Sequence, residues 1–167
     1  MTLQEFFLKQ KKAIRKRSEE VFALLRPEHM NWRPAESALG VAEMLRHLWV
    51  SEEGVRRVAL DANFAYYEAR IPGGLPAVLG TPGSLENELG NIDRVHRETL
   101  EAVAAWPASI FEEERVHPGL GFRRKVSVIL FGINEHEIHH RAQIMMCLRI
   151  LGNPAPQPFT WPPGKTR

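Results

Sequence analysis

Cysteine and long apolar runs are almost absent from this chain. Cys147 is its single cysteine, so internal disulfides are excluded and a reducing compartment, the cytoplasm, is expected. No stretch approaches the roughly 18–20 consecutive apolar residues of a membrane-spanning helix. The N-terminal segment has neither an uninterrupted apolar core nor a small-residue cleavage site, so it does not resemble a signal peptide. We therefore expect a protein that does not enter a membrane.

An excess of charge of one sign is also missing. Lysine and arginine together number 22 and the acidic residues 20, so the net charge of +2 creates no strong field that would attract nucleic acid. Basic residues cluster between Lys9 and Arg17, but Glu5 and Glu19 flank them. We interpret the cluster as a solvated helix face rather than a phosphate-binding patch, and nucleic acid is not an expected partner.

The remaining composition is that of an ordinary globular domain. Hydrophobic residues make up 44% and charged residues 25% of the 167 residues, which suffices for one core without disulfides. We expect a single domain over residues 1–167. A proline-rich tail from about residue 153 should lie extended, because proline cannot continue a helix.

Four segments repeat apolar residues at the spacing of three and four that is typical of an amphipathic helix. These segments are residues 3–26, 37–60, 85–106 and 123–151. Pro27 ends the first, Ser37 and Ser84 are suitable N-caps for the next two, and Gly152 occupies the position of a C-cap glycine after the last. The pattern predicts an all-α protein, a four-helix bundle.

The two longer connections in this bundle differ in composition. Residues 61–84, between the second and third helices, are rich in proline and glycine and are predicted to form a long loop, with a short helical turn near Phe64 to Tyr67. Residues 107–122 form a second connection that turns at Pro118 and Gly119. No convincing alternating strand pattern is present. The long loop allows a crossover connection, so the topology of the bundle stays open.

Two histidines of the last helix interrupt its apolar stripe. His136 and His140 are separated by one turn and share the face that carries Ile144 and Leu148, whereas His139 points toward the rim. An i, i+4 pair of imidazoles can converge on one ion. Buried imidazoles that hydrogen-bond to carbonyls or acidic partners would explain the same pattern, so the pair alone leaves both interpretations open.

Two more histidines occupy helical positions near the predicted core. His47 lies at the edge of the apolar stripe of the second helix, where it can reach the core. Together with His136 and His140 it would form the three-nitrogen face of an open, catalytic type of metal site. His96 lies in the middle of the third helix stripe and has only Asp93 as a neighbouring ligand type, so it is a weaker candidate for completing the metal shell.

Two blocks of the sequence resemble the DinB-like superfamily of bacterial stress-associated bundles, which includes YfiT-like proteins and bacillithiol transferases. MNWRPAESALGVAEMLRHLWVSEE is similar to the family segment that leads into the helix with the first metal histidine, and HEIHHRAQI is similar to its H-x-x-x-H-R-G-Q signature. The resemblance implies metal ligands at His47, His136 and His140. Ala142 stands where the family often has glycine, a change that a helix interior accepts.

The implied cofactor is one divalent transition metal ion, zinc or nickel first, with iron, copper or manganese as further options. Three neutral imidazoles leave the ionic charge uncompensated, which lowers the pKa of a bound water or thiol. Two enzymatic reactions are then open. Characterised relatives suggest transfer of a low-molecular-weight thiol to an electrophile; the alternative is hydrolysis by a metal-bound water, with Glu137 or Glu43 as general base. A non-catalytic, stress-associated metal-binding protein is the third possibility.

The partners follow from the same residues. The expected partners are a small-molecule thiol or other small substrate, and a second copy of the chain in a homodimer. The dimer is suggested by the resemblance and by aromatic residues in the connections and tail. These are Phe64, Tyr66, Tyr67, Phe159 and Trp161. The substrate itself is not indicated, and its specificity is expected to reside in residues 61–84 and 107–122.

Overall fold

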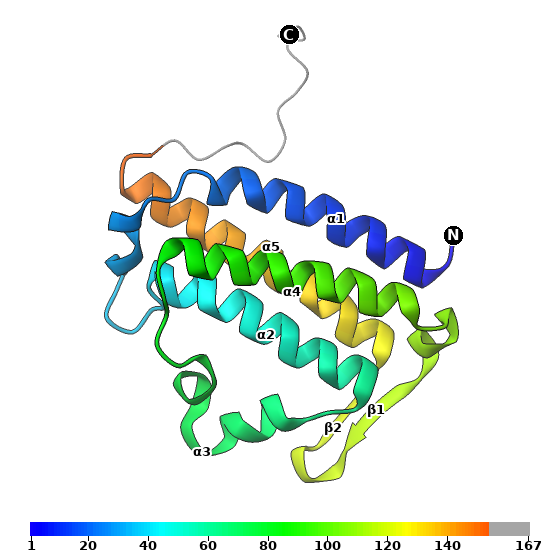
Figure 1. The fold of residues 1–167 in the computed structure, drawn as a ribbon. Coiled ribbons are helices and arrows are strands. Elements are labelled where there is room, and N and C mark those ends of the chain that lie inside the picture. The colour runs from blue at the N-terminus through cyan, green and yellow to red at the C-terminus, as the bar shows by residue number, and fades with distance from the viewer. Residues whose placement is uncertain (154–167) are drawn as a thin grey trace, which may run out of the picture.

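The computed structural model describes residues 1–153, and the proline-rich tail beyond them lies outside the described residues. Four long helices form the bundle (Figure 1). They are α1 (Leu3–Phe22), α2 (Val41–Asp61), α4 (Leu85–Ala105) and α5 (Val126–Ile150). The prediction of an all-α four-helix bundle is confirmed. No helix of the described residues is long and apolar enough to cross a membrane.

The helix ends follow local capping rules, with one correction. Ser84 caps α4 as predicted, because its hydroxyl accepts a hydrogen bond from the backbone N–H of Asn87 at 3.2 Å. The prediction of Ser37 as the N-cap of α2 is wrong: the N-cap is Gly40, whose N–H donates to the Glu43 carboxylate at 2.8 Å. Gly152 ends α5 at φ 80°, a left-handed conformation that glycine adopts without strain.

Two connections contain structure that the sequence pattern did not predict. Residues 61–84 hold α3 (Ala65–Leu79), a helix kinked at Gly74, where φ is 63°. Residues 107–125 hold an antiparallel hairpin of β1 (Glu114–His117) and β2 (Phe122–Lys125), so α5 begins three residues later than predicted. The prolines and glycines of α3 kink the helix but do not prevent it from forming. The strands of the hairpin have four residues each, which is too short for an alternation of apolar and polar residues to be recognised.

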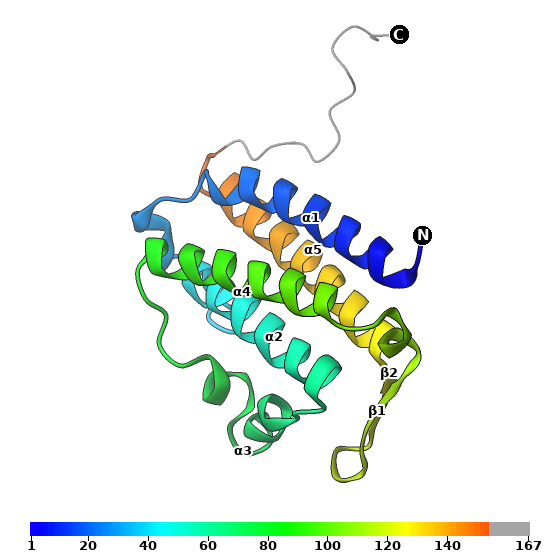
Figure 2. The same cartoon turned by 45° about the vertical axis from the view of Figure 1, so that its right-hand side comes forward.

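The order of packing makes the connection from α2 to α4 a crossover. The start of α2 and the start of α4 both lie in one apolar cluster with the end of α5, while the ends of α2 and α4 lie in a second cluster with its beginning. The two helices are therefore parallel, and the chain between them returns along the bundle. Figures 1 and 2 show α3 and the hairpin on the same side of the bundle, next to α2.

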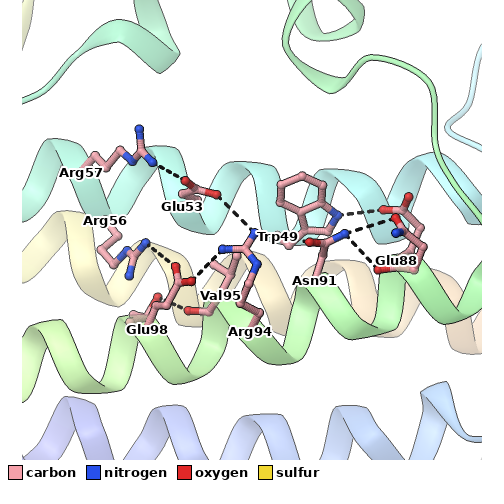
Figure 3. A network of polar contacts seen from close by, with 11 residues as sticks. Trp49, Glu53, Arg56, Arg57, Glu88, Asn91, Arg94, Val95 and Glu98 are labelled. Atoms are coloured by element: carbon pink, nitrogen blue, oxygen red, sulfur yellow. Dashed lines mark hydrogen bonds and ion pairs between the residues drawn. The ribbon is translucent and has the colours of Figure 1, made fainter.

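Parallel α2 and α4 are joined by polar contacts along their outer side (Figure 3). Trp49 Nε1 donates to Glu88 at 2.8 Å, and Arg56 pairs with Glu98 at 3.0 Å. Arg94 pairs with Glu98 at 2.7 Å on its own helix and lies 3.8 Å from Glu53. The partly exposed ion pairs of Arg56, Arg94 and Glu98 fix the register of the two helices more than they stabilise the fold, since exposed ion pairs contribute little, whereas Glu88 is buried.

A buried polar layer separates the two apolar clusters. Lys11 Nζ contacts Glu52 at 2.6 Å and Glu137 at 2.9 Å, and Arg15 contacts Glu137 at 3.1 Å. All four side chains are nearly inaccessible, and they come from α1, α2 and α5. His96 of α4 is buried at the same level. Because two cations match two carboxylates, the layer is electrically balanced, and it marks the level at which the candidate site lies.

Candidate metal centre

The predicted histidines meet in the structure. His47 of α2 and His136 and His140 of α5 each offer a ring nitrogen, and these three atoms lie within 4.8 Å of one another. The Nε2 atoms of His47 and His136 are 2.9 Å apart. Two nitrogens bound to one zinc ion at ordinary bond lengths are about 3.3 Å apart, so the three rings are close to the separation that a shared ion requires.

Neighbouring side chains fix the orientation of two of the rings. The amide oxygen of Gln143 accepts a hydrogen bond from His140 Nδ1 at 2.6 Å, which leaves Nε2 of that ring unprotonated and available. Ser51 lies one turn after His47, and its hydroxyl contacts His47 Nδ1 at 2.9 Å. Tyr66 of α3 extends this chain, because its hydroxyl contacts Ser51 at 2.7 Å. The contacts of Gln143 with His140 and of Ser51 with His47 both use Nδ1, so the Nε2 side of each of these rings faces the other histidines.

The rings are neutral in this environment. Burial, with the neighbouring charges of His140 and Arg70, lowers the pKa of His47 to about 4. Burial, with His140 and His47, lowers the pKa of His136 to about 3, and burial also lowers the pKa of His140. Neutral imidazole is the form that ligates a metal, so the protein holds the donors ready without a proton to displace.

The group of three histidines contains no fourth metal-ligating side chain among the described residues. His96, the candidate for completing the metal shell, lies elsewhere. His96 is buried near α1: burial, reinforced by Arg15 and Lys11, lowers its pKa to about 3. His139 is exposed, as predicted. An arrangement of three donors is that of an open site, since structural zinc sites are normally closed by four protein ligands.

The two carboxylates proposed as general bases have other contacts. Glu137 is bonded to Lys11 and Arg15, whose charges outweigh its burial and bring its pKa to about 2. Glu43 accepts from the N-cap of α2 and pairs with Arg33 at 2.9 Å, and these contacts, the Gly40 bond first, lower its pKa. Neither residue lines the cavity beside the histidines. The contacts of both are those of structural residues.

A cavity of about 380 Å³ opens beside His47 and His136. Its walls come from α2, from α5 and from the two segments interpreted as connections, α3 and β2. The walls include Ser51, Glu52, Tyr66, Tyr67, Arg70, Phe122 and Arg124. Tyr66, Tyr67, Arg70 and Phe122 belong to the two segments that were expected to set specificity, although Tyr66 and Tyr67 had been assigned to a dimer surface. Ser51, Glu52 and Arg124 were not predicted. Ser51 had a detectable signal, since it follows His47 by one helical turn.

Glu52 differs from Glu43 and Glu137 in its position. It lines the cavity, and Lys11 and Arg15 hold its Oε2 at 2.6 Å and 3.6 Å. Its other oxygen, Oε1, is buried and has no hydrogen-bond partner among the described residues. A buried carboxylate oxygen without a partner is costly, which points to a water, an ion or a reacting group that uses it. Glu137 Oε1 also has no hydrogen-bond partner among the described residues, but it lies 3.1 Å from Arg15 and does not line the cavity.

Known proteins were compared with the chain as a whole. Residues 10–144, which include all three histidines, match the family model of the DinB superfamily. No curated protein matches. Solved structures share the fold, among them three that are 11–18% identical to this chain.

A DinB-like protein from Bacillus cereus is 18% identical with a TM-score of 0.71, covering 92% of this chain and 95% of its own. The DinB-like protein YjoA from Bacillus subtilis is 17% identical with a TM-score of 0.64, covering 90% of this chain and 92% of its own. YfiT from Bacillus subtilis, described as a probable metal-dependent hydrolase with an unusual four-helix bundle topology, is 11% identical with a TM-score of 0.68, covering 90% and 88%. The family match extends over most of the chain, which therefore belongs to the DinB superfamily.

Proposed function

We propose that this protein is a metal-dependent enzyme that activates a low-molecular-weight thiol and transfers it to an electrophile. The ligands are His47, His136 and His140, and the ion is zinc or nickel, both of which accept imidazole. The observation that carries the proposal is the group of three neutral imidazoles beside a cavity, without a fourth ligand among the described residues. When bound, the ion lowers the pKa of a thiol or a water at the site.

The protein's own residues then have defined tasks. Ser51 and Gln143 orient the rings of His47 and His140. Tyr66, Tyr67 and Phe122 supply an apolar wall that limits access of water to a reacting thiolate. The thiol proton passes to solvent, the sulfur forms a bond to the electrophilic carbon, and the leaving group departs with its electron pair. No general base is required, since a thiol ionises much more readily than water.

Hydrolysis is the alternative, and two observations favour it. YfiT is described as a probable metal-dependent hydrolase, and Glu52 offers a buried oxygen without a partner at the cavity wall. Attack by water requires a base, and Glu52 is placed for that role better than Glu43 or Glu137. Glu52→Gln separates the two reactions when circular dichroism shows that the variant is folded, because the change also removes the charge that pairs with Lys11. In folded variant protein a hydrolase loses turnover about 100-fold or more, whereas thiol transfer is reduced far less.

The first test is metal binding. Elemental analysis of natively purified protein should give one divalent ion per chain. In calorimetric titration His140→Ala should lose stoichiometric binding while circular dichroism stays unchanged, because the apolar stripes of the helices remain. His139→Ala is the matched control, since its ring is adjacent but exposed and outside the group. Unchanged affinity in His140→Ala, or equal losses in both variants, would contradict the assignment.

The second test is thiol binding. Cobalt-substituted protein should develop a sulfur-to-metal charge-transfer band when cysteine or bacillithiol is added, and His47→Ala should weaken it. A hydrolase predicts inhibition by thiols instead. If no thiol changes the spectrum and a panel of esters or amides is turned over only with metal, the transferase assignment fails. If neither occurs, a non-catalytic metal-binding role is left.

We further propose a cytoplasmic homodimer, on the basis of the resemblance and the lone cysteine. The aromatic residues no longer support the dimer: Phe64 is buried, Tyr66 and Tyr67 line the cavity, and Phe159 and Trp161 lie outside the described residues. Sedimentation velocity should give a species of twice the 19.1 kDa chain mass. A monomer at tens of micromolar would refute it.

A further inference from the structure

The cavity beside the histidines carries positive charge that no acidic residue of the described chain pairs with. Two arginines line it, Arg70 from α3 and Arg124 from β2. Among residues 1–153 no carboxylate lies within ion-pair distance of either guanidinium. Glu52, the acidic residue of the lining, is already bonded to Lys11 and close to Arg15.

Local geometry aims both arginines at the cavity. Tyr66, Tyr67 and Arg70 are spaced at i, i+1 and i+4 on α3, so they share one helix face, and the Arg70 guanidinium lies over the Tyr66 ring at 5.7 Å. On β2 alternate residues share a face: Phe122 and Arg124 line the cavity, whereas Arg123 between them pairs with Glu114 on the other strand. The ring contact with Tyr66 holds the Arg70 guanidinium in place.

We propose that Arg70 and Arg124 form a subsite for the negatively charged group, a carboxylate or phosphate, of the small molecule that reacts at the histidines. The inference rests on the proposed function for the reaction, which makes that molecule an anionic thiol. A guanidinium presents paired N–H groups that match an oxyanion. Arg124 donates one of its N–H groups to the carbonyl oxygen of Arg123 at 2.7 Å and has the others free for a ligand.

The subsite deepens the thiol-transfer proposal by naming a substrate class. The histidine group holds the reacting end, the aromatic residues Tyr66, Tyr67 and Phe122 contact the apolar middle, and the arginines hold the charged end. A neutral thiol of the same size lacks the last contact. The enzyme should therefore discriminate between thiols by charge.

The experiment has a thiol arm and a metal-free arm. In the thiol arm, cobalt-substituted protein is titrated with 3-mercaptopropionate and with neutral 2-mercaptoethanol, and the charge-transfer band reports affinity. Arg70→Gln should weaken binding of the anionic thiol about tenfold and Arg124→Gln about threefold, the smaller loss reflecting its exposure. Binding of 2-mercaptoethanol should change less than twofold. Arg70→Lys should recover part of the loss.

Arg123→Gln is the matched control, because it removes the same charge from the same strand on the opposite face.

In the metal-free arm, succinate and inorganic phosphate are titrated into isotopically labelled protein and followed by nuclear magnetic resonance. Shifts at cavity residues that disappear in Arg70→Gln support the subsite, and the stronger of the two anions identifies the preferred group. This arm does not depend on thiol transfer, so it decides the subsite even if no thiol gives a band.

The subsite is refuted by equal affinity for both thiols in the wild type together with no cavity shifts from either anion. It is also refuted if Arg123→Gln weakens anion binding as much as Arg124→Gln, since the effect then comes from net charge alone. Circular dichroism confirms that each variant is folded before binding is measured.

Discussion

At the scale of single residues, the histidine group depends on hydrogen bonds that select one nitrogen in two of its three rings. His140 donates from Nδ1 to Gln143, and Ser51 contacts Nδ1 of His47. A ring fixed in this way presents Nε2 to the centre of the group and loses little freedom when a metal binds. The side chains behind the rings, Ser51 and Gln143, therefore determine how well the three histidines act as one site.

Ser51→Ala should lower metal affinity by about tenfold, because residues that orient metal-binding histidines typically contribute 10–100-fold. The helix should stay intact, since alanine is the best helix former. Thr99→Ala is a suitable control: that hydroxyl is also buried but bonds to the carbonyl of Val95 on its own helix. Competition with a metal indicator measures both. An affinity in Ser51→Ala equal to the wild type would remove Ser51 from the site.

At the scale of elements, α3 forms part of the site because it packs unusually close to α2. A Cβ on Gly54 of α2 would lie 2.3 Å from the Tyr66 ring, closer than real Cβ contacts. The missing side chain at Gly54 lets Tyr66 reach Ser51 and lets Arg70 lie over the Tyr66 ring. One glycine in a helix thus positions the cavity wall.

Gly54→Ala should therefore destabilise the protein by about 1–3 kcal/mol, since overpacking outweighs the gain in helix propensity. With the whole side chain removed, in Tyr66→Gly, the ring atoms and the Cβ that crowd position 54 are gone, so the same change should stabilise by up to about 1 kcal/mol. Gly90→Ala on α4, where a Cβ meets nothing within 4 Å, is the control and should stabilise in either background. Chemical denaturation of both glycine variants in each background, together with the two parent proteins, tests the reversal of sign. A constant effect of Gly54→Ala in both backgrounds would show that Tyr66 is not the obstacle.

At the scale of the whole molecule, a buried polar layer between two apolar clusters joins α1, α2 and α5, and His96 of α4 is buried beside it. The layer balances Lys11 and Arg15 against Glu52 and Glu137, with His96 beside them. Removing one partner of such a set costs about 3–5 kcal/mol, because the other charges stay buried. The layer ties α1 to the helices that carry the metal ligands, so it links folding to the site.

His96 makes stability depend on pH. Burial, reinforced by Arg15, Lys11 and Lys12 of α1 and opposed by Glu137 of α5, lowers its pKa from 6.5 to about 3. Below pH 6.5 His96 binds a proton in the unfolded chain but not in the folded chain. Each unit by which the pH falls therefore lowers the free energy of unfolding by up to about 1.4 kcal/mol, down to about pH 3. His96→Leu should eliminate that contribution and cost little at pH 7, where the ring's Nδ1 is unpaired. Denaturation of metal-free protein between pH 4 and pH 7 measures both slopes, and parallel slopes would contradict the prediction.

The sequence by itself determined the features that depend on one helix. Apolar periodicity located the four bundle helices, Ser84 and Gly152 marked two of their ends, and the i, i+4 spacing put His136 and His140 on one face, where His140 is buried and His136 half-buried. These predictions hold because a helix fixes the relative directions of its own side chains. Periodicity cannot find strands of four residues or a kinked helix, so β1, β2 and α3 were missed.

Only the tertiary structure decided which side chains meet across helices. A helical wheel puts Glu137 on the site-facing side, but it contains no information about Lys11 and Arg15, which approach from α1 and bind that carboxylate. His47 and His136 are 89 residues apart, and their Nε2 atoms meet because α2 packs on α5. The cavity likewise forms, with Arg70 and Arg124 in its wall, only when α3 and the hairpin pack beside α2. The physical reason is that periodicity specifies a direction about one axis, whereas a site requires the distance and angle between several axes.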